Sequence, residues 1–207
     1  LWVGFNSLDS MDVSANTALT DLRFPGNELT ALDVSTNTAL EHLDLWVNQL
    51  TALDVNNNTA LTTLKASSND IIALDVSANT ALTTLYCENN QLTYLNMRNG
   101  VTDALTTFNA TNNDSLECIE TLDPDYATAN WTYANGNIDE GVTFAVYCSL
   151  DPPTLDPPTL VINEILAYNN ACCTDANGDY DSYLELYNYG DEEVDIGGMI
   201  ITDDLNN

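Results

Sequence analysis

The stretch LTTLYCENNQL at residues 82–92 decides the fold, because its apolar residues follow the frame LxxLxLxxNxL. The same frame begins at Leu19, Leu40 and Leu61, in steps of 21 residues. A second marker, the tetrad Asn-Thr-Ala-Leu, keeps this step and begins at residues 16, 37, 58 and 79. Self-similarity at one fixed period is typical of a solenoid, in which each copy packs only against its neighbours.

Each period contains two strand-like segments. Residues 29–37 repeat the spacing of the first segment, with Leu29, Leu32, Val34 and Asn37 in corresponding places. A helix is a poor interpretation, because each period holds many Asn, Thr and Asp residues, which are weak helix formers. We therefore expect a mainly β fold: a right-handed solenoid whose coils are two short β arms joined by tight turns, with Leu and Val pointing inward.

Two columns of asparagine run along the repeat. The first contains Asn6, Asn27, Asn48, Asn69, Asn90 and Asn113, and the second contains Asn16, Asn37, Asn58 and Asn79. A buried turn leaves backbone groups without partners, and an asparagine side chain can both donate and accept hydrogen bonds there. Identical residues stacked one coil apart can also bond to each other. We expect both columns to be structural.

The periodic region resembles leucine-rich repeats, and the match stays in register through residues 1–117. The periodic region resembles the 21-residue leucine-rich repeats of proteins that Bacteroidetes-type bacteria secrete. Leu1, Val3, Asn6 and Leu8 match the tail of an earlier copy. We therefore expect the native protein to extend beyond Leu1.

The repeat is expected to end in a cap. Two additional residues enter at Gly100, and a degenerate last coil runs through residues 105–113. An open solenoid end would expose core leucines and a strand edge, so a cap with an aromatic plug is needed. Trp131 and Phe144 suit that role.

The cysteines of the solenoid and cap have different expected roles. Residues 118–150 resemble the C-terminal flank of the same bacterial proteins, in which two cysteines pair. The resemblance implies a Cys118–Cys148 disulfide, which would contribute about 3 kcal/mol through the entropy of the closed loop. Cys87 takes an inward position of the repeat and is expected to be a buried free thiol.

The outward positions beside the first strand of each coil are the candidate binding surface. Two of the three basic residues, the single histidine and two of the three tryptophans occupy this face. Aromatic and arginine side chains are the usual anchors of interfaces. The alternative is that these positions vary without a function. The candidate ligand-binding residues are Trp2, Arg23, His42, Asp44, Trp46, Lys65, Tyr86 and Glu88.

The opposite arm carries a column of aspartates at residues 12, 33, 54 and 75. Stacked carboxylates repel each other across neighbouring strands. A bound cation could relieve the repulsion, but one carboxylate per coil offers few of the six or more oxygens that a hard cation needs. We expect a solvated structural ladder that is hydrogen-bonded to Thr or Ser.

A second module follows the cap. The segment Asp-Pro-Pro-Thr-Leu occurs twice in residues 151–160, and proline pairs favour an extended, semi-rigid linker. Residues 161–207 contain the segments INEI, LELYN and VDIGG and resemble the start of a lamin-tail domain. The resemblance implies a partial immunoglobulin-like β-sandwich, since such sandwiches run to about 100 residues.

Three features of these modules leave alternatives open. The spacing of a calcium loop is found in five oxygen-bearing residues: Asp175, Asn177, Asp179, Asp181 and Glu185. The glutamate does not reach its position in the EF-hand frame. Two alternatives therefore stay open: a bound Ca²⁺ ion or no cofactor. Cys172 and Cys173 could bridge each other or pair with sequence outside this chain. Ser10 and Ser115 lie in Asp-Ser-apolar tripeptides that resemble an O-glycosylation motif of Bacteroidetes-type bacteria.

Composition and charge exclude several classes of function. A net charge of −29 over 207 residues opposes contact with nucleic acid or an anionic membrane. No run approaches the roughly 20 apolar residues of a membrane helix. A hydrophobic content of 44% favours a packed core over disorder.

The motifs do not indicate an enzyme. No CxxC, HExxH, GxSxG or phosphate-binding glycine loop is present, and the single histidine has no evident nucleophile beside it. We expect an extracellular or cell-surface module for adhesion, with a protein or glycan ligand. The alternatives are a structural stalk or filament that self-associates, or accessory modules of a larger secreted enzyme.

Overall fold

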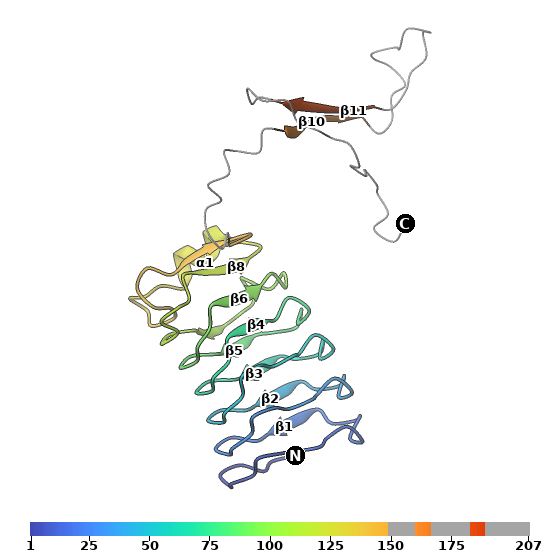
Figure 1. Cartoon of the computed structure of the whole chain (residues 1–207), viewed down its shortest axis with the longest axis vertical. Coiled ribbons are helices and arrows are strands. Elements are labelled where there is room, and N and C mark those ends of the chain that lie inside the picture. Colours follow the sequence, from blue (N-terminus) through green and yellow to red (C-terminus); the bar gives the residue numbers. More distant parts are fainter. Residues whose placement is uncertain (149–159, 167–182, 189–207) are drawn as a thin grey trace. The chain divides into compact units, whose positions relative to one another are not determined.

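The computed structural model describes residues 1–148, 160–166 and 183–188. The chain divides into two compact units, Leu1–Cys148 and Ser149–Asn207. The first unit is a β-solenoid of about six turns (Figure 1). The finer predicted boundaries, at residues 117, 150 and 160, stay predictions.

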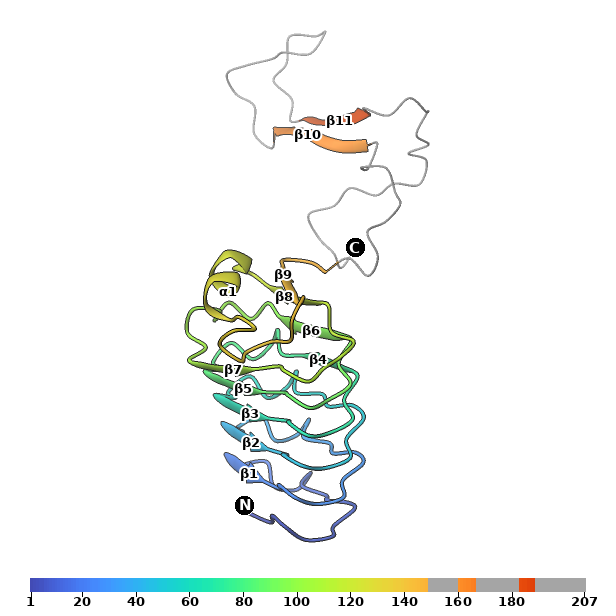
Figure 2. The ribbon, with the colours of Figure 1, turned by 90° about the vertical axis from the view of Figure 1, so that its left-hand side faces the viewer.

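One strand of each coil contributes to a parallel five-stranded sheet along one side of the solenoid (Figure 2). Its strands, in order, are β1 (Asp21–Arg23), β2 (His42–Asp44), β3 (Thr63–Lys65), β5 (Thr84–Tyr86) and β7 (Thr107–Asn109). Leu22, Leu43, Leu64, Leu85 and Phe108 align across it. The two additional residues near Gly100 leave this register intact, because Leu85 still pairs with Phe108.

The periodic apolar residues form the core, as predicted from the repeat. From residue 19 onward, each coil buries the two inward positions of its first strand segment and the apolar residue that follows its asparagine, so the interior is one continuous column. Leu43, Leu45 and Leu50 of the second full coil are all 0% exposed. Cys87 is buried and free, as expected. Burial first, and the negative charge of Glu88 second, raises the pKa of its thiol.

The second arm differs from the expectation of two strands in every coil. It forms strands only from β4 (Ala73–Asp75) onward, in a parallel sheet with β6 (Tyr94–Met97), β8 (Cys118–Thr121) and β9 (Thr143–Ala145). Pairing begins where Asn96 takes the place of the repeated aspartate, opposite Asp75. Like charges directly opposite destabilise a strand pair, whereas Asn96 Nδ2 donates to Asp75 Oδ2 at 3.2 Å.

Each aspartate of this arm closes a tight turn. The carboxylates of Asp12, Asp33, Asp54 and Asp75 accept the backbone N–H of the residue two positions later, at 2.8–2.9 Å. The donors in these four bonds are backbone groups of the same turn. Hydrogen bonds from the Ser14 side chain and then its backbone lower the pKa of Asp12, and Ser35 acts on Asp33 in the same way.

These turns predict a specific titration behaviour. We expect the carboxyls of Asp12 and Asp33 to titrate below the ordinary aspartate pKa of about 4, because the bonded form is the charged one. Their contribution to stability is then present above pH 4 and is lost as the pH falls through the lowered folded-state pKa. NMR titration of the carboxyl carbons checks this. Ser14→Ala should raise the pKa of Asp12 and leave Asp33 unchanged, and an unchanged Asp12 would contradict the assignment.

The two asparagine columns satisfy backbone groups, as predicted, although neither column bonds side chain to side chain. In the first column, Asn69 Nδ2 donates to three carbonyls and its Oδ1 accepts the N–H of Leu50 at 3.0 Å. In the second column, Asn58 Nδ2 donates to the carbonyls of Val34 and Asn37. Within the described residues, the Oδ1 atoms of this second column, in Asn37, Asn58 and Asn79, have no partner.

The unit ends in a non-repeating segment that packs on the last coil. The helix α1 (Pro124–Asn130) begins after Asp123, whose Oδ1 accepts the N–H of Tyr126 at 2.9 Å. Trp131 follows the helix, is 6% exposed and has its ring 4.7 Å from that of Phe108. The disulfide between Cys118 and Cys148 encloses this segment and confirms the expected pairing.

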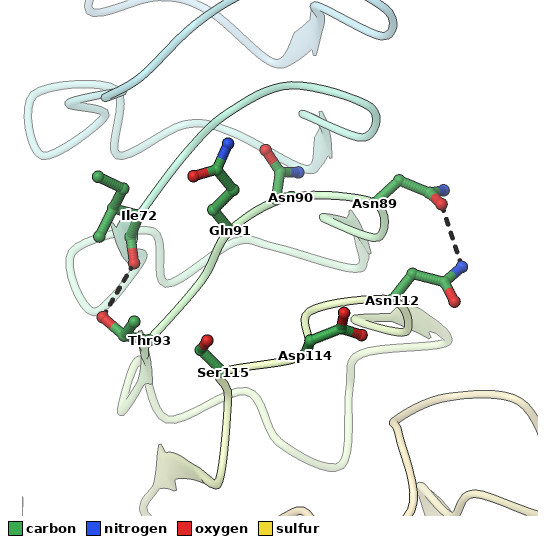
Figure 3. A pocket seen from close by; sticks show the side chains of 8 residues that line it. All are labelled: Ile72, Asn89, Asn90, Gln91, Thr93, Asn112, Asp114 and Ser115. Atoms are coloured by element: carbon green, nitrogen blue, oxygen red, sulfur yellow. Dashed lines mark hydrogen bonds between the residues drawn. The ribbon is translucent and has the colours of Figure 1, made fainter.

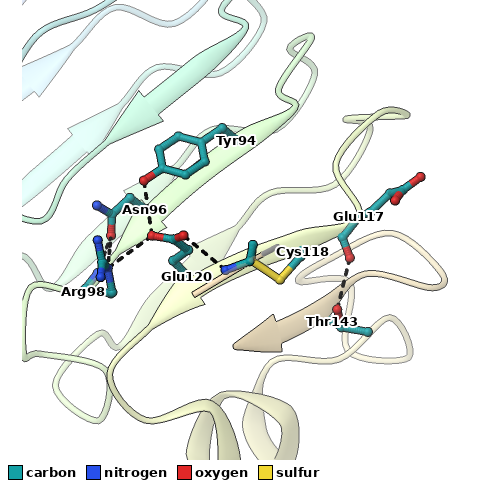
Figure 4. The surroundings of a disulfide bond; sticks show 8 residues. Tyr94, Asn96, Arg98, Glu117, Cys118, Glu120 and Thr143 are labelled. Atoms are coloured by element: carbon teal, nitrogen blue, oxygen red, sulfur yellow. Dashed lines mark hydrogen bonds and ion pairs between the residues drawn. A yellow bond between two sulfur atoms is a disulfide. The ribbon is translucent and has the colours of Figure 1, made fainter. Parts of the chain in front are cut away.

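An ion pair between half-buried Arg98 and buried Glu120 lies beside the disulfide (Figure 4). Glu120 Oε2 is 3.2 Å from Nε of Arg98, and its Oε1 accepts the backbone N–H of Cys148 at 3.1 Å. The Tyr94 hydroxyl donates to the same carboxylate at 3.2 Å. Burial first, and the charge of Glu120 second, raises the pKa of Tyr94. One carboxylate thus connects β6, β8 and the disulfide.

In the second unit, β10 (Leu160–Leu166) and β11 (Tyr183–Asn188) form an antiparallel pair. These strands contain the INEI and LELYN segments. The immunoglobulin-like sandwich stays a prediction. Asp175, Asn177, Asp179, Asp181, Cys172 and Cys173 lie outside the described residues, and only the backbone of Glu185 falls within them.

Candidate functional site

The outward side of the five-stranded sheet presents three aligned columns of side chains, which we call the strand face. The columns are Asp21, His42, Thr63, Thr84 and Thr107; then Trp2, Arg23, Asp44, Lys65, Tyr86 and Asn109; then Gly4, Pro25, Trp46, Ser67, Glu88 and Thr111. Trp2 joins the middle column through a bridge to Arg23. Because the coils stack in register, residues 21 positions apart become neighbours on this face.

Charged residues of the strand face are mostly paired with each other. Arg23 holds Asp21 with two hydrogen bonds, from Nε at 2.9 Å and from Nη2 at 2.7 Å. This contact lowers the pKa of Asp21. Asp44 lies opposite Lys65 in the register, where opposite charges attract. The Lys65 ammonium also lies over the Tyr86 ring, 5.8 Å from its centroid.

Apolar side chains are exposed at one end of the strand face. Trp46 is 44% exposed and Val47 40%. Trp2 and Phe5 belong to the first coil of the given sequence and complete this cluster. The rings of Phe5 and Trp46 meet edge to face at 6.4 Å. We call these four residues the aromatic patch. An apolar cluster at the surface of an otherwise acidic chain indicates an interaction site.

Two residues of the aromatic patch also have an unfavourable backbone conformation. Each coil places one residue at positive φ just before the first-column asparagine, and most coils use Gly26, Ser68 or an asparagine there. Phe5 and Val47 adopt φ of 57° at this position, which is rare for bulky side chains. Such strain is concentrated at functional sites.

A hollow of about 200 Å³ lies next to the aromatic patch, between the second and fourth strands of the face. Its lining residues are Trp46, Lys65, Ser67, Tyr86 and Glu88. The hollow thus combines two aromatic rings, one cation, one carboxylate and one hydroxyl. Within the described part of the chain, the Oε2 atom of Glu88 is buried and has no hydrogen-bond partner.

The structure brings together half of the candidate ligand-binding residues around this hollow. Trp46, Lys65, Tyr86 and Glu88 line it, and Asp44 lies beside Lys65. Trp2 is part of the aromatic patch, Arg23 is bridged to Trp2, and half-buried His42 is in the first column.

Phe5 and Val47 were not among the candidates, because the repeat assigns them to a turn. The signal that would have found them is a bulky apolar residue where other coils have glycine, serine or asparagine.

A larger hollow, of about 720 Å³, opens between the fifth and sixth coils (Figure 3). Its polar lining includes Gln91, Asp114 and Ser115. In earlier coils the asparagine is followed two positions later by leucine or isoleucine, whereas Asp114 and Ser115 place one more residue between Asn113 and Leu116. Ser115 and Ser10, the candidate glycosylation sites, are both exposed.

Two further properties of the described residues concern metal ions and membranes. They contain no cluster of three or more His, Cys, Asp or Glu residues that could hold a metal ion. No helix among them is long and apolar enough to cross a membrane.

The fold and the strand face define the class of protein: a parallel β-solenoid with leucine-rich-repeat periodicity. The functional domain of InlJ from Listeria monocytogenes, which includes a cysteine ladder, is 31% identical with a TM-score of 0.51; the match covers 58% of this chain and 30% of that one. The chain thus spans less than a third of the InlJ structure. In residues 1–148 the ladder has no counterpart, because Cys87 is the single cysteine of its inward column.

The ectodomain of the receptor kinase SOBIR1 from Arabidopsis thaliana has the same fold. It is 21% identical with a TM-score of 0.50, over 58% of this chain and 72% of that one. Both solved structures are leucine-rich-repeat proteins. No protein-family model matches the sequence, and no curated protein matches it either.

Proposed function

We propose that the solenoid is an extracellular or cell-surface adhesion module that binds a protein through its strand face. The observation that carries this proposal is the part of the aromatic patch that lies inside the repeat, where Trp46 is 44% and Val47 40% exposed. Burying such a ring in an interface removes a large apolar area from water, while only a few side-chain torsions lose their freedom. Phe5 and Val47 support it, because glycine or asparagine would relax their backbone.

The neighbours and the covalent structure support the same proposal. InlJ and the SOBIR1 ectodomain share the repeat fold, and SOBIR1 is a receptor whose matched region is an ectodomain. The Cys118–Cys148 disulfide is of the kind that persists in oxidising compartments.

The remaining predictions fit this proposal as accessory features. Residues 118–148 would act as the C-terminal cap, and residues 161–207 would begin a lamin-tail sandwich of a bacterial secreted protein. A calcium ion would bind at Asp175, Asn177, Asp179, Asp181 and Glu185, and Ser10 and Ser115 would carry glycans. Intact mass of the native protein tests the two serines.

Trp46→Ala tests the proposed function directly. Peptides selected from a phage-displayed random library against the 207-residue chain provide the probe. We expect Trp46→Ala to weaken their binding at least about tenfold, because a central aromatic anchor is removed. Biolayer interferometry measures the change.

Tyr133→Ala is the matched control, because Tyr133 is 61% exposed but lies away from the strand face. It should leave binding unchanged. Peptides that bind equally well to the Trp46→Ala variant would contradict a strand-face site. Binding confined to a glycan array would replace the protein ligand with a carbohydrate, and concentration-dependent assembly unaffected by Trp46→Ala would favour a stalk.

A further inference from the structure

The unpartnered carboxylate of Glu88 is the feature that neither the repeat nor the aromatic patch explains. Its Oε2 atom is buried, and among the described residues nothing bonds to it. Burying part of a carboxylate without a donor is unfavourable. The hollow in front of it is lined by Trp46 and Tyr86, and its volume of about 200 Å³ accommodates one long side chain.

Charge pairing on the strand face isolates Glu88 further. The three columns contain five charged side chains: Asp21, Arg23, Asp44, Lys65 and Glu88. Arg23 bonds to Asp21, and Lys65 lies opposite Asp44 in the register. Glu88 is the remaining charge, and no salt bridge to it occurs within residues 1–148. Lys65 also makes no salt bridge within residues 1–148 and lines the same hollow, but its ammonium lies over the Tyr86 ring and not on Glu88. Glu88 therefore has no cation bound to it.

We infer that the hollow receives an arginine side chain of the bound protein, an inference that rests on the proposed function. Glu88 Oε2 accepts a hydrogen bond from the guanidinium, and the Trp46 and Tyr86 rings contact its planar faces. Arginine suits this site better than lysine, because a guanidinium can stack on an aromatic ring while it donates to a carboxylate.

The position of Lys65 adds a second prediction to this inference. Its ammonium lies over Tyr86 at 5.8 Å from the centroid, where it competes with an incoming cation. When the guanidinium enters, the flexible Lys65 side chain moves toward Asp44, its neighbour in the register. Removing the charge of Lys65 should therefore strengthen the binding of a cation, whereas removing the charge of Glu88 should weaken it.

The test uses the full 207-residue chain and a small probe, N-acetyl-arginine N-methylamide. Its neutral control is the citrulline analogue, which has nearly the same shape. We expect the arginine probe to shift the indole N–H resonance of Trp46 saturably, and the citrulline probe to bind at least about tenfold more weakly. Glu88→Gln should weaken the arginine probe by a similar factor, and Lys65→Met should tighten it.

Glu117→Gln is the matched control, because Glu117 is exposed and lies on the opposite arm. It should leave the titration unchanged. Equal binding of the two probes, or unchanged affinity in the Glu88→Gln variant, overturns the inference. So does loss of affinity for the arginine probe in the Lys65→Met variant, which would mean that Lys65 supports binding instead of competing with the probe. Selected peptides that depend on Trp46 but are not enriched in arginine would overturn this inference and leave the proposed function intact.

Discussion

Asn69→Ala is expected to lower the free energy of unfolding by about 3 kcal/mol, and Asn58→Ala by only about 1 kcal/mol. Both asparagines belong to columns that repeat along the solenoid, and both are buried. The difference follows from what each side chain leaves behind when it is removed.

Asn69 uses both ends of its amide. Its Oδ1 atom accepts the N–H of Leu50 at 3.0 Å, the one hydrogen bond of that N–H in the described structure. Its Nδ2 donates to the carbonyls of Leu45, Ala66 and Ser67. These carbonyls also accept from Asn48, Asn90 and the backbone N–H of Val47, so each keeps a partner in the alanine variant. Alanine therefore leaves one buried N–H without an acceptor, which costs about 1–3 kcal/mol, and removes three further contacts.

Asn58 uses only one end of its amide. Its Nδ2 donates to Val34 and Asn37, but these carbonyls also accept backbone N–H groups from Asn37 and Leu40. Its Oδ1 has no partner among the described residues, so its loss leaves no donor unsatisfied. What remains is a small cavity and two weakened contacts.

Urea unfolding followed by far-UV circular dichroism measures both variants. Asn6→Ala is the control, because Asn6 begins the first column but is exposed, and it should change stability by less than about 0.5 kcal/mol. Equal destabilisation by the two buried substitutions would mean that burial alone, and not hydrogen bonding, decides the contribution of these columns.

The repeat frame predicts most of the solenoid because it is a local, periodic property. Residues 82–92 already place Leu85 and Cys87 inward and Asn90 in a turn, and the structure agrees. The extent of the second sheet could not be read in the same way. It depends on Asn96 meeting Asp75 across a strand pair, which is a property of the register and not of either residue.

The candidate site was predictable in outline only. Stacking at the 21-residue period brings Trp46, Lys65 and Glu88 together, because they occupy adjacent coils. Phe5 and Val47 occupy left-handed turn positions, which the leucine frame does not encode. The burial of Glu88 Oε2 depends on how the neighbouring side chains pack, and no sequence pattern specifies it.

Trp131→Ala is expected to have the largest effect, lowering the free energy of unfolding by about 4 kcal/mol. Trp131 is 6% exposed and contacts three aromatic rings from different elements. Its ring centroid lies 4.7 Å from that of Phe108, 5.9 Å from that of Phe144 and 6.2 Å from that of Tyr126. Alanine would leave a cavity between the last coil and the disulfide-closed segment.

Reducing the disulfide in the Trp131→Ala variant shows whether the substitution only loosens the packing of residues 118–148 or detaches them from the last coil. Breaking the Cys118–Cys148 bond alone should lower stability by about 3 kcal/mol through the entropy of the open loop. The two perturbations act on one segment, and in a solenoid each unit depends only on its neighbours. Once residues 118–148 have detached, the second perturbation has little left to destabilise, so the combined effect should be smaller than the sum.

Urea unfolding of the wild type and the Trp131→Ala variant, with and without a reducing agent, gives the four measurements of this cycle. Tyr133→Ala, at an exposed position two residues away, is the control and should change stability by less than about 0.5 kcal/mol. A fully additive result would mean that the segment stays attached without either contact. The Arg98–Glu120 pair would then be the contact that holds it, because Glu120 also bonds to the backbone of Cys148.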